Sequence, residues 1–200
     1  MEQTMIIEIE GIDGIGKTMQ CRLLKKWFEE RSEESIIVKD LESTQLGRQI
    51  KALFTTDEPR TKEVELFGFL CCKAHLFSEI IGPSVSKGVH VICDRGVGSL
   101  LSYFEVLGFE AGFLKNVLAA VLPEQFTAVT VLIEGDINEA LRRNLAKPTH
   151  SKFDNMGFEF FEKQQEVYRR LARTGNWIVV DGNESTERVH TSVTAKIVHL

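Results

Sequence analysis

The segment Gly11–Thr18 limits the possible folds of this chain more than any other part of the sequence. It satisfies the pattern G-x-x-x-x-G-K-[ST] with the residues Gly11, Ile12, Asp13, Gly14, Ile15, Gly16, Lys17 and Thr18. An apolar run, Met5–Ile9, precedes it, and an amphipathic segment, Met19–Arg31, follows it. Glycines between a strand and a helix let backbone N–H groups point at phosphate oxygens, where the helix dipole adds positive charge. The pattern therefore predicts a phosphate-binding loop.

The residue types in this loop suit ATP together with Mg²⁺. The side chain of Lys17 can reach the phosphoryl group that is transferred, and the Thr18 hydroxyl can ligate the metal. We expect all eight residues of the loop to contact ATP. The alternative is an ordinary glycine-rich turn between a strand and a helix, which the strand before it and the helix after it make less probable.

Five short runs rich in apolar and β-branched residues predict buried strands: Met5–Ile9, Ile36–Lys39, Val89–Cys93, Val129–Ile133 and Trp177–Val180. Segments with helical periodicity lie between them, including Met19–Arg31, Val64–Ser86, Ile137–Leu145 and Gly157–Arg173. Strands that alternate with helices are typical of a parallel sheet covered on both faces. We predict an α/β fold of three layers with a five-stranded parallel sheet, formed by a single domain over residues 1–200.

Charge and hydropathy exclude two classes of partner. The formal net charge of −5 argues against a nucleic-acid surface, because proteins that bind a phosphate backbone usually carry a basic excess. No apolar run approaches the ~20 residues of a membrane span. The first residues lack the basic region and the cleavage site of a signal peptide. We expect a cytoplasmic protein that binds small nucleotides.

Asp94 and Arg95 directly follow the third predicted strand. Open α/β sheets bind ligands at the carboxyl ends of their strands. A carboxylate in that place commonly holds Mg²⁺ in phosphate-binding-loop proteins. A guanidinium beside it can bind two oxygens of an acceptor phosphate in a bidentate contact. The alternative is an incidental ion pair at a strand end.

Several motifs, in order along most of the chain, resemble those of the thymidylate kinase family. The segment Ile9–Gln20 is similar to that family's E-G-x-D-G-x-G-K-T-T-Q, and Val91–Arg95 to its V-x-C-D-R. Further matches are Glu42–Gly47, Phe69–Lys73 and Asp154–Glu162 with Tyr168. The guanine-reading N/T-K-x-D motif of GTPases is absent. The resemblance implies phosphorylation of dTMP by Mg-ATP, and a homodimer formed through helices outside the active site.

The resemblance also implies roles on the acceptor side. Asp13 would face the sugar of the acceptor, Phe69 would stack on the pyrimidine, and Lys73 would lie near its exocyclic oxygen or its phosphate. Spacing alone leaves two interpretations open for Phe69 and Lys73, because residues four apart share one helix face and a phenylalanine with a lysine at its edge also suits a core. Tyr103 and Tyr168 are further candidates for acceptor binding, and Tyr168 suits a helical core equally well.

A lid-like loop is expected at about residues 143–156, where helix breakers and polar residues separate two helices. Position 15 of the phosphate-binding loop is isoleucine, so positive charge for the transferring phosphoryl group has to come from elsewhere. Arg143 and Lys152 are the candidates, by similarity to thymidylate kinases whose catalytic arginine lies in the lid. A solvated helix face would explain the same basic residues.

The acceptor side departs from the family pattern in several places. Glu42 lies where some relatives carry a phosphate-binding arginine, Lys73 replaces an arginine, and Gly96 replaces the tyrosine of D-R-Y. Two alternatives follow for an enzyme: a deoxynucleoside kinase, or a kinase of another pyrimidine monophosphate. A third alternative, of another class, is a nucleotide-sensing module without useful turnover.

Overall fold

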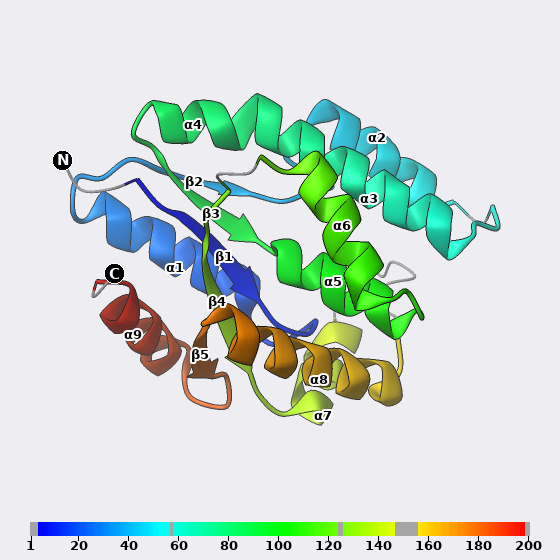
Figure 1. The fold of residues 1–200 in the computed structure, drawn as a ribbon. Helices are drawn as coiled ribbons and strands as arrows, with labels where there is room; N and C mark the ends of the chain where they lie inside the picture. Colours follow the sequence, from blue (N-terminus) through cyan, green and yellow to red (C-terminus); the bar gives the residue numbers. More distant parts are fainter. Residues whose placement is uncertain (1–3, 57, 124–125, 147–155, 199–200) are drawn as a thin grey trace.

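The computed structural model describes residues 4–56, 58–123, 126–146 and 156–198, and its ribbon is drawn in Figure 1. Its sheet has five parallel strands in the order β2-β3-β1-β4-β5. The strands are β1 (Ile6–Glu10), β2 (Ser35–Val38), β3 (His90–Asp94), β4 (Val129–Glu134) and β5 (Ile178–Asp181). The predicted five-stranded parallel sheet is confirmed, with each strand within a residue or two of the expected bounds. The single-domain organisation stays a prediction.

Strand β1 lies in the middle of the sheet and is fully buried. It pairs with β3 on one side and with β4 on the other, and its Ile9 is opposite Asp94 in the register with β3. Because all the strands run in the same direction, the chain leaves β1 and β3 at the same edge of the sheet. This register brings the glycine-rich loop after β1 next to the residues that follow β3.

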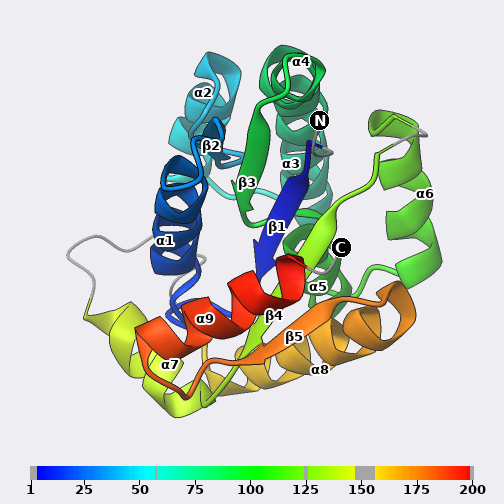
Figure 2. The ribbon, with the colours of Figure 1, turned by 90° about the vertical axis from the view of Figure 1, so that its left-hand side faces the viewer.

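Helices cover both faces of the sheet, in agreement with the nearly continuous apolar strands. Figure 2 shows α1 and α9 on one side, with α3, α5 and α6 on the other. The helices are α1 (Lys17–Glu29), α2 (Gln45–Phe54), α3 (Lys62–Leu76), α4 (Gly82–Ser86), α5 (Val97–Val106), α6 (Ala111–Val121), α7 (Ile137–Leu145), α8 (Phe158–Gly175) and α9 (Thr186–Ile197).

The long helical segment predicted over Val64–Ser86 is confirmed as a nearly continuous run of helix. It begins two residues earlier, at Lys62, where the Thr61 side chain accepts a hydrogen bond from the Val64 amide. A π-helical turn, Phe77–Ile81, joins α3 to α4. No helix in the described ranges is long and apolar enough to span a membrane.

Helix α1 fixes the position of the loop that precedes it, because its buried face packs on the central strands. Cys21, Leu24 and Phe28 recur at helical spacing and are fully buried, in one cluster with Ile7 and Ile9 of β1. The Phe28 ring also stacks on His90, with ring centroids 4.3 Å apart. Helix α1 is thereby anchored to the sheet along its length, which fixes the position of its first turn.

Replacing the core residue Leu24 with alanine should lower the free energy of unfolding by about 2–5 kcal/mol, because it removes buried methyl groups and leaves a cavity. Equilibrium unfolding in urea measures the change. The neighbouring Lys25→Ala is the matched control, since this side chain is 43% exposed, and it should stay within about 0.5 kcal/mol of the wild type. Equal effects of the two substitutions would contradict the packing of α1 described above.

Candidate active site

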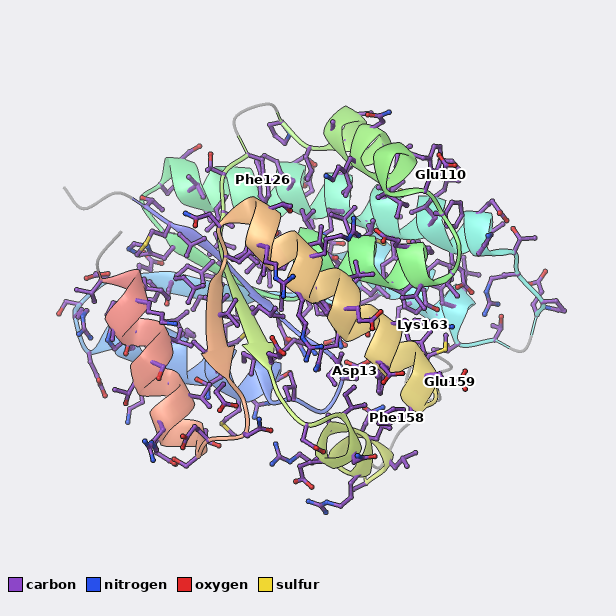
Figure 3. The ribbon with its side chains drawn as sticks, turned by 60° about the horizontal axis from the view of Figure 1, so that its bottom comes forward. Asp13, Glu110, Phe126, Phe158, Glu159 and Lys163 are labelled. Atoms are coloured by element: carbon purple, nitrogen blue, oxygen red, sulfur yellow. The ribbon has the colours of Figure 1, made fainter. Side chains whose placement is uncertain are left out.

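A cavity of about 890 Å³ opens at the carboxyl edge of the sheet. The loop after β1, the residues after β2 and β3, and side chains of α2, α3, α5, α7 and α8 line it. In the view of Figure 3, Asp13 lies near α7 and the beginning of α8, where Phe158 and Glu159 are labelled. One end of the cavity is lined by charged residues and the other by aromatic rings, so it suits a ligand with a phosphate group and a flat ring system.

The glycine-rich loop has the backbone that its sequence predicts. Gly11, Gly14 and Gly16 have φ angles of 139°, 84° and 108°, in a region that other residues rarely adopt. The loop ends at the first turn of α1, and the dipole and backbone N–H groups at the N-terminus of a helix attract anions. The Lys17 ammonium lies inside the loop and donates to the carbonyl oxygens of Gly11 and Ile12, at 2.8 and 2.7 Å.

Helix α7 supports the loop from outside. A Cβ atom on Gly14 would overlap the carbonyl oxygen of Ala140, which is buried in α7. Glycine at position 14 is therefore required both by its φ angle and by this close approach of two backbones. Arg143, one turn further along α7, lines the cavity while its guanidinium donates to Glu139 at 2.7 Å.

Asp94 connects the two loops at the charged end. It is 4% exposed, and its carboxylate accepts a hydrogen bond of 2.6 Å from the Thr18 hydroxyl. The same carboxylate oxygen lies 3.0 Å from the ammonium of Lys39, which directly follows β2. Burial works against the charge of Lys39, but Asp94 raises the pKa of this lysine above its ordinary value. Asp94 thus holds a carboxylate oxygen beside the Thr18 hydroxyl, a pair of hard ligands of the kind that Mg²⁺ prefers.

Arg95 also bridges the loops after β1 and β3. Its guanidinium forms an ion pair with Asp13 and lies 3.4 Å from the Ser99 hydroxyl. Its backbone has a φ angle of 84°, which is strained for a residue with a long side chain, and its amide donates to Ile9 at 3.2 Å. Strained residues of this kind are concentrated at functional sites, where the surrounding structure holds them in place.

Aromatic side chains form the other end of the cavity. The ring of Phe69 lies 5.5 Å from that of Phe54 and 5.8 Å from that of Phe104. Tyr103 contacts Phe160 at the beginning of α8, with ring centroids 5.4 Å apart, and burial raises the pKa of its hydroxyl. A planar base could stack against such a surface, with ring separations of about 4.5–7 Å.

Lys73 and Tyr168 are enclosed by protein. The Lys73 ammonium forms an ion pair of 2.9 Å with Asp40, and both side chains are largely buried. Burial opposes the charge of Lys73, but the carboxylates of Asp40 and Glu8 raise its pKa. Tyr168 is fully buried, and its hydroxyl lies 2.9 Å from that of Ser99. Both groups therefore have protein partners within the described structure.

The structure brings most of the predicted site residues to one cavity. Those that line it are Asp13, Gly14, Gly16, Lys17, Thr18, Phe69, Asp94, Arg95, Tyr103 and Arg143. Among the described residues, the predicted site residues that do not line it are Gly11, Ile12, Ile15, Lys73 and Tyr168. Lys152 and most of the expected lid, residues 147–155, lie outside the described residues.

The sequence analysis assigned no role to several residues that line the cavity. Lys39 directly follows β2, so the argument from strand ends that identified Asp94 could have identified it as well. Ser99 and Gln164 lie inside helices, where no local pattern distinguishes them from other polar residues. The phenylalanines at 54, 104, 160 and 161 carry the periodicity of core residues, so only the folded arrangement shows that they border a cavity.

Lys73→Met should lower the free energy of unfolding by about 3–5 kcal/mol, because it leaves the carboxylates of Asp40 and Glu8 buried without their cation. Urea unfolding measures the change, and Lys163→Met, at an exposed position of α8, is the matched control. A change below about 1 kcal/mol would show that the ion pair is accessible to solvent in solution.

Comparisons with known proteins agree with this geometry. A profile described as thymidylate kinase matches residues 9–193. A protein of Pyrococcus abyssi named probable thymidylate kinase is 32% identical over 96% of this chain and 95% of its own. The thymidylate kinase of Kosmotoga olearia is 29% identical over 94% and 93%. The crystal structure of thymidylate kinase from Ehrlichia chaffeensis has the same fold, with a TM-score of 0.79 over 98% of this chain and 22% identity. The chain belongs to the thymidylate kinase family.

Proposed function

We propose that this chain is a nucleoside monophosphate kinase that transfers the γ-phosphoryl group of ATP to dTMP. Family membership identifies the enzyme class, and the relatives named above are thymidylate kinases. The observation that carries the proposal is the bridge between Asp13 and Arg95. This ion pair supports the proposal because the Arg95 guanidinium, which would bind an acceptor phosphate, lies beside the loop that would hold the phosphates of the donor.

On the donor side, the loop over residues 11–18 would bind the phosphates of ATP through its backbone N–H groups and Lys17. Thr18 and Asp94 would hold Mg²⁺. The metal would neutralise charge on the phosphate oxygens. In the described part of the chain, no group of three or more histidine, cysteine or acidic side chains could hold a metal ion. One hydroxyl and one carboxylate fit Mg²⁺ nonetheless, since this ion keeps several waters and binds through few protein ligands plus substrate phosphates.

On the acceptor side, Arg95 would bind the phosphate of dTMP and Asp13 would face its sugar. The aromatic end of the cavity, with Phe69 and Tyr103, would hold the thymine ring by stacking. The substrate-binding roles of Lys73 and Tyr168 stay predictions, because a direct contact would require these enclosed side chains to exchange partners.

Catalysis would rest on positioning and electrostatics, since phosphoryl transfer needs little covalent chemistry from the protein. Arg95 would hold an acceptor oxygen in line with the γ-phosphorus, and Lys17 would stabilise charge on the transferring group. Arg143 would add a further positive charge from α7 when it exchanges Glu139 for phosphate. Lys152 is the other candidate for this role.

A coupled assay of ADP release should show turnover with Mg-ATP and dTMP well above that with dUMP, dCMP, dAMP, dGMP or thymidine. Arg95→Met should raise the KM for dTMP by about tenfold to a hundredfold, because it removes charge-assisted hydrogen bonds to the phosphate. The KM for ATP should change little. Arg22→Met, at an exposed position of α1, is the matched control and should behave like the wild type.

Other results of this assay would redirect the proposal. Turnover of a different monophosphate would keep the mechanism and change the acceptor. Turnover of thymidine but not of dTMP would refute the role of Arg95 in phosphate binding. Tight ATP binding without turnover of any acceptor would identify a nucleotide-sensing module.

We also propose that the chain forms a homodimer through α3. Val64, Phe67 and Cys71 recur at intervals of three and four residues, so they share one face of this helix. Val64 is 53% exposed, Phe67 is 56% exposed, and Cys71 is exposed as well. An apolar row of this kind on a surface helix supports a protein interface away from the cavity.

Phe67→Glu should convert a dimer into a monomer, because it would place a charge in the apolar centre of the interface. Sedimentation equilibrium should give twice the chain mass of 22.6 kDa for the wild type and one chain mass for the variant. Val198→Glu is the matched control, since Val198 is 61% exposed and follows α9, and it should leave the mass unchanged. A wild-type protein with the mass of a single chain would refute the dimer.

A further inference from the structure

Two carboxylates on the central strand bind the first turn of α5. Glu8 and Glu10 are 3% and 0% exposed, and they point to the same face because they are two residues apart. Glu10 accepts hydrogen bonds of 3.0 Å from the Gly96 amide and 2.9 Å from the Ser99 amide. Glu8 accepts one of 3.0 Å from the Val97 amide. Three amides at the start of α5, where helix geometry provides no partner, are thus satisfied by side chains of β1.

Glu8 also occupies the space beside Gly96. A Cβ atom built on Gly96 would lie 2.5 Å from Cγ of Glu8 and still closer to its carboxyl group. The φ angle of Gly96 is −125°, outside the left-handed region that favours glycine. Glycine is required here because the Glu8 side chain lies where a side chain of residue 96 would begin.

Glu8 is unusual in a strand that is buried on both faces. Burial, and after it the neighbouring Glu10, raise the pKa of Glu8 to about 7, while Lys73 lowers it. An apolar residue would fill the same place in the sheet without this electrostatic cost. The carboxyl group instead makes specific contacts: its other oxygen lies 3.3 Å from the Thr130 hydroxyl, so both oxygens have partners.

The residue that these contacts hold in place is Arg95. It lies between the end of β3 and the first turn of α5, in a strained conformation with a φ angle of 84°. Its amide is bound to Ile9 of β1, and the next two residues are bound to Glu10 and Glu8. The amide of the strained residue and the two amides that follow it therefore all donate hydrogen bonds to β1.

We propose that Glu8 is a positioning residue for Arg95, and that it acts as a pair with Gly96. The Glu8 carboxyl group binds the α5 amide at position 97 and fills the space left by the missing side chain at position 96. Together these contacts fix the turn that directs the Arg95 guanidinium toward the acceptor phosphate. The role of Glu8 in catalysis rests on the proposed function, whereas its steric pairing with Gly96 does not.

The steric pairing is tested by thermal unfolding of a double-mutant cycle without any substrate. Gly96→Ala should lower the unfolding midpoint of the wild type by about 4–8 °C, because the added methyl group overlaps Glu8. The same substitution in a Glu8→Ala background should lower it by less than about 2 °C, since the three atoms nearest to the added Cβ all belong to the Glu8 side chain and are then gone. Gly112→Ala is the matched control, because a Cβ atom there would meet nothing. Equal losses from Gly96→Ala in both backgrounds would overturn the pairing.

The positioning role is tested by steady-state kinetics on folded variants. Glu8→Ala should raise the KM for dTMP about fivefold to tenfold, because it leaves the Val97 amide without its partner and frees the turn. The KM for ATP should stay within about twofold, since the donor loop is untouched. Glu8→Gln keeps an oxygen acceptor of the same shape and should remain within about twofold of the wild type for both substrates.

An unchanged KM for dTMP in Glu8→Ala would overturn the positioning role, and so would an equal rise in both KM values. Failure of the proposed function has a different signature. A wild-type protein that does not phosphorylate dTMP would refute that function, while the thermal cycle would still decide whether Glu8 and Gly96 form a pair.

Discussion

The parallel register of β1 with β3 is the constraint on which the site depends. It places Ile9 opposite Asp94, so the glycine-rich loop and the residues after β3 begin at the same level of the sheet. Two contacts then join them: Thr18 donates to Asp94, and Arg95 pairs with Asp13. A shift of register would separate both pairs. The chemistry of the charged end is therefore set by strand pairing in the core.

The cavity joins two surfaces of different origin. The segments that follow strands supply most of its charged groups, and their positions follow from backbone hydrogen bonds in the sheet. Helices α2, α3, α5 and α8 supply its aromatic groups, whose positions follow from side-chain packing. Charged groups held by strand pairing can bind a phosphate group through hydrogen bonds, whose lengths vary little. Packed aromatic rings recognise a base by its shape and by the surface area that it buries. This division suits a transfer reaction in which the phosphates have to be aligned more strictly than the base.

The fold and the charged end could be predicted from the sequence because both depend on local signals. Buried strands are short apolar runs, and the phosphate-binding loop needs glycines at fixed intervals, so Asp94 could be placed at a strand end without a structure. The network around Lys73 could not be predicted. Its partners Asp40 and Glu8 come from other elements, and spacing along α3 carries no information about them. The role of Glu8 could not be predicted for the same reason: no local sequence pattern shows that a side chain at position 8 meets the backbone at position 96.

The overlap between Glu8 and position 96 also constrains the order in which the sequence can change over evolutionary time. A chain that carries Glu8 does not acquire a side chain at 96 by one tolerated substitution, because the new Cβ atom would collide with a buried group. Loss of Glu8 has to come first, and it leaves the Val97 amide without a partner until a second change compensates. The two positions are epistatic. A change to an aromatic residue at 96 therefore passes through a less stable intermediate, which preserves the glycine once the pair is present.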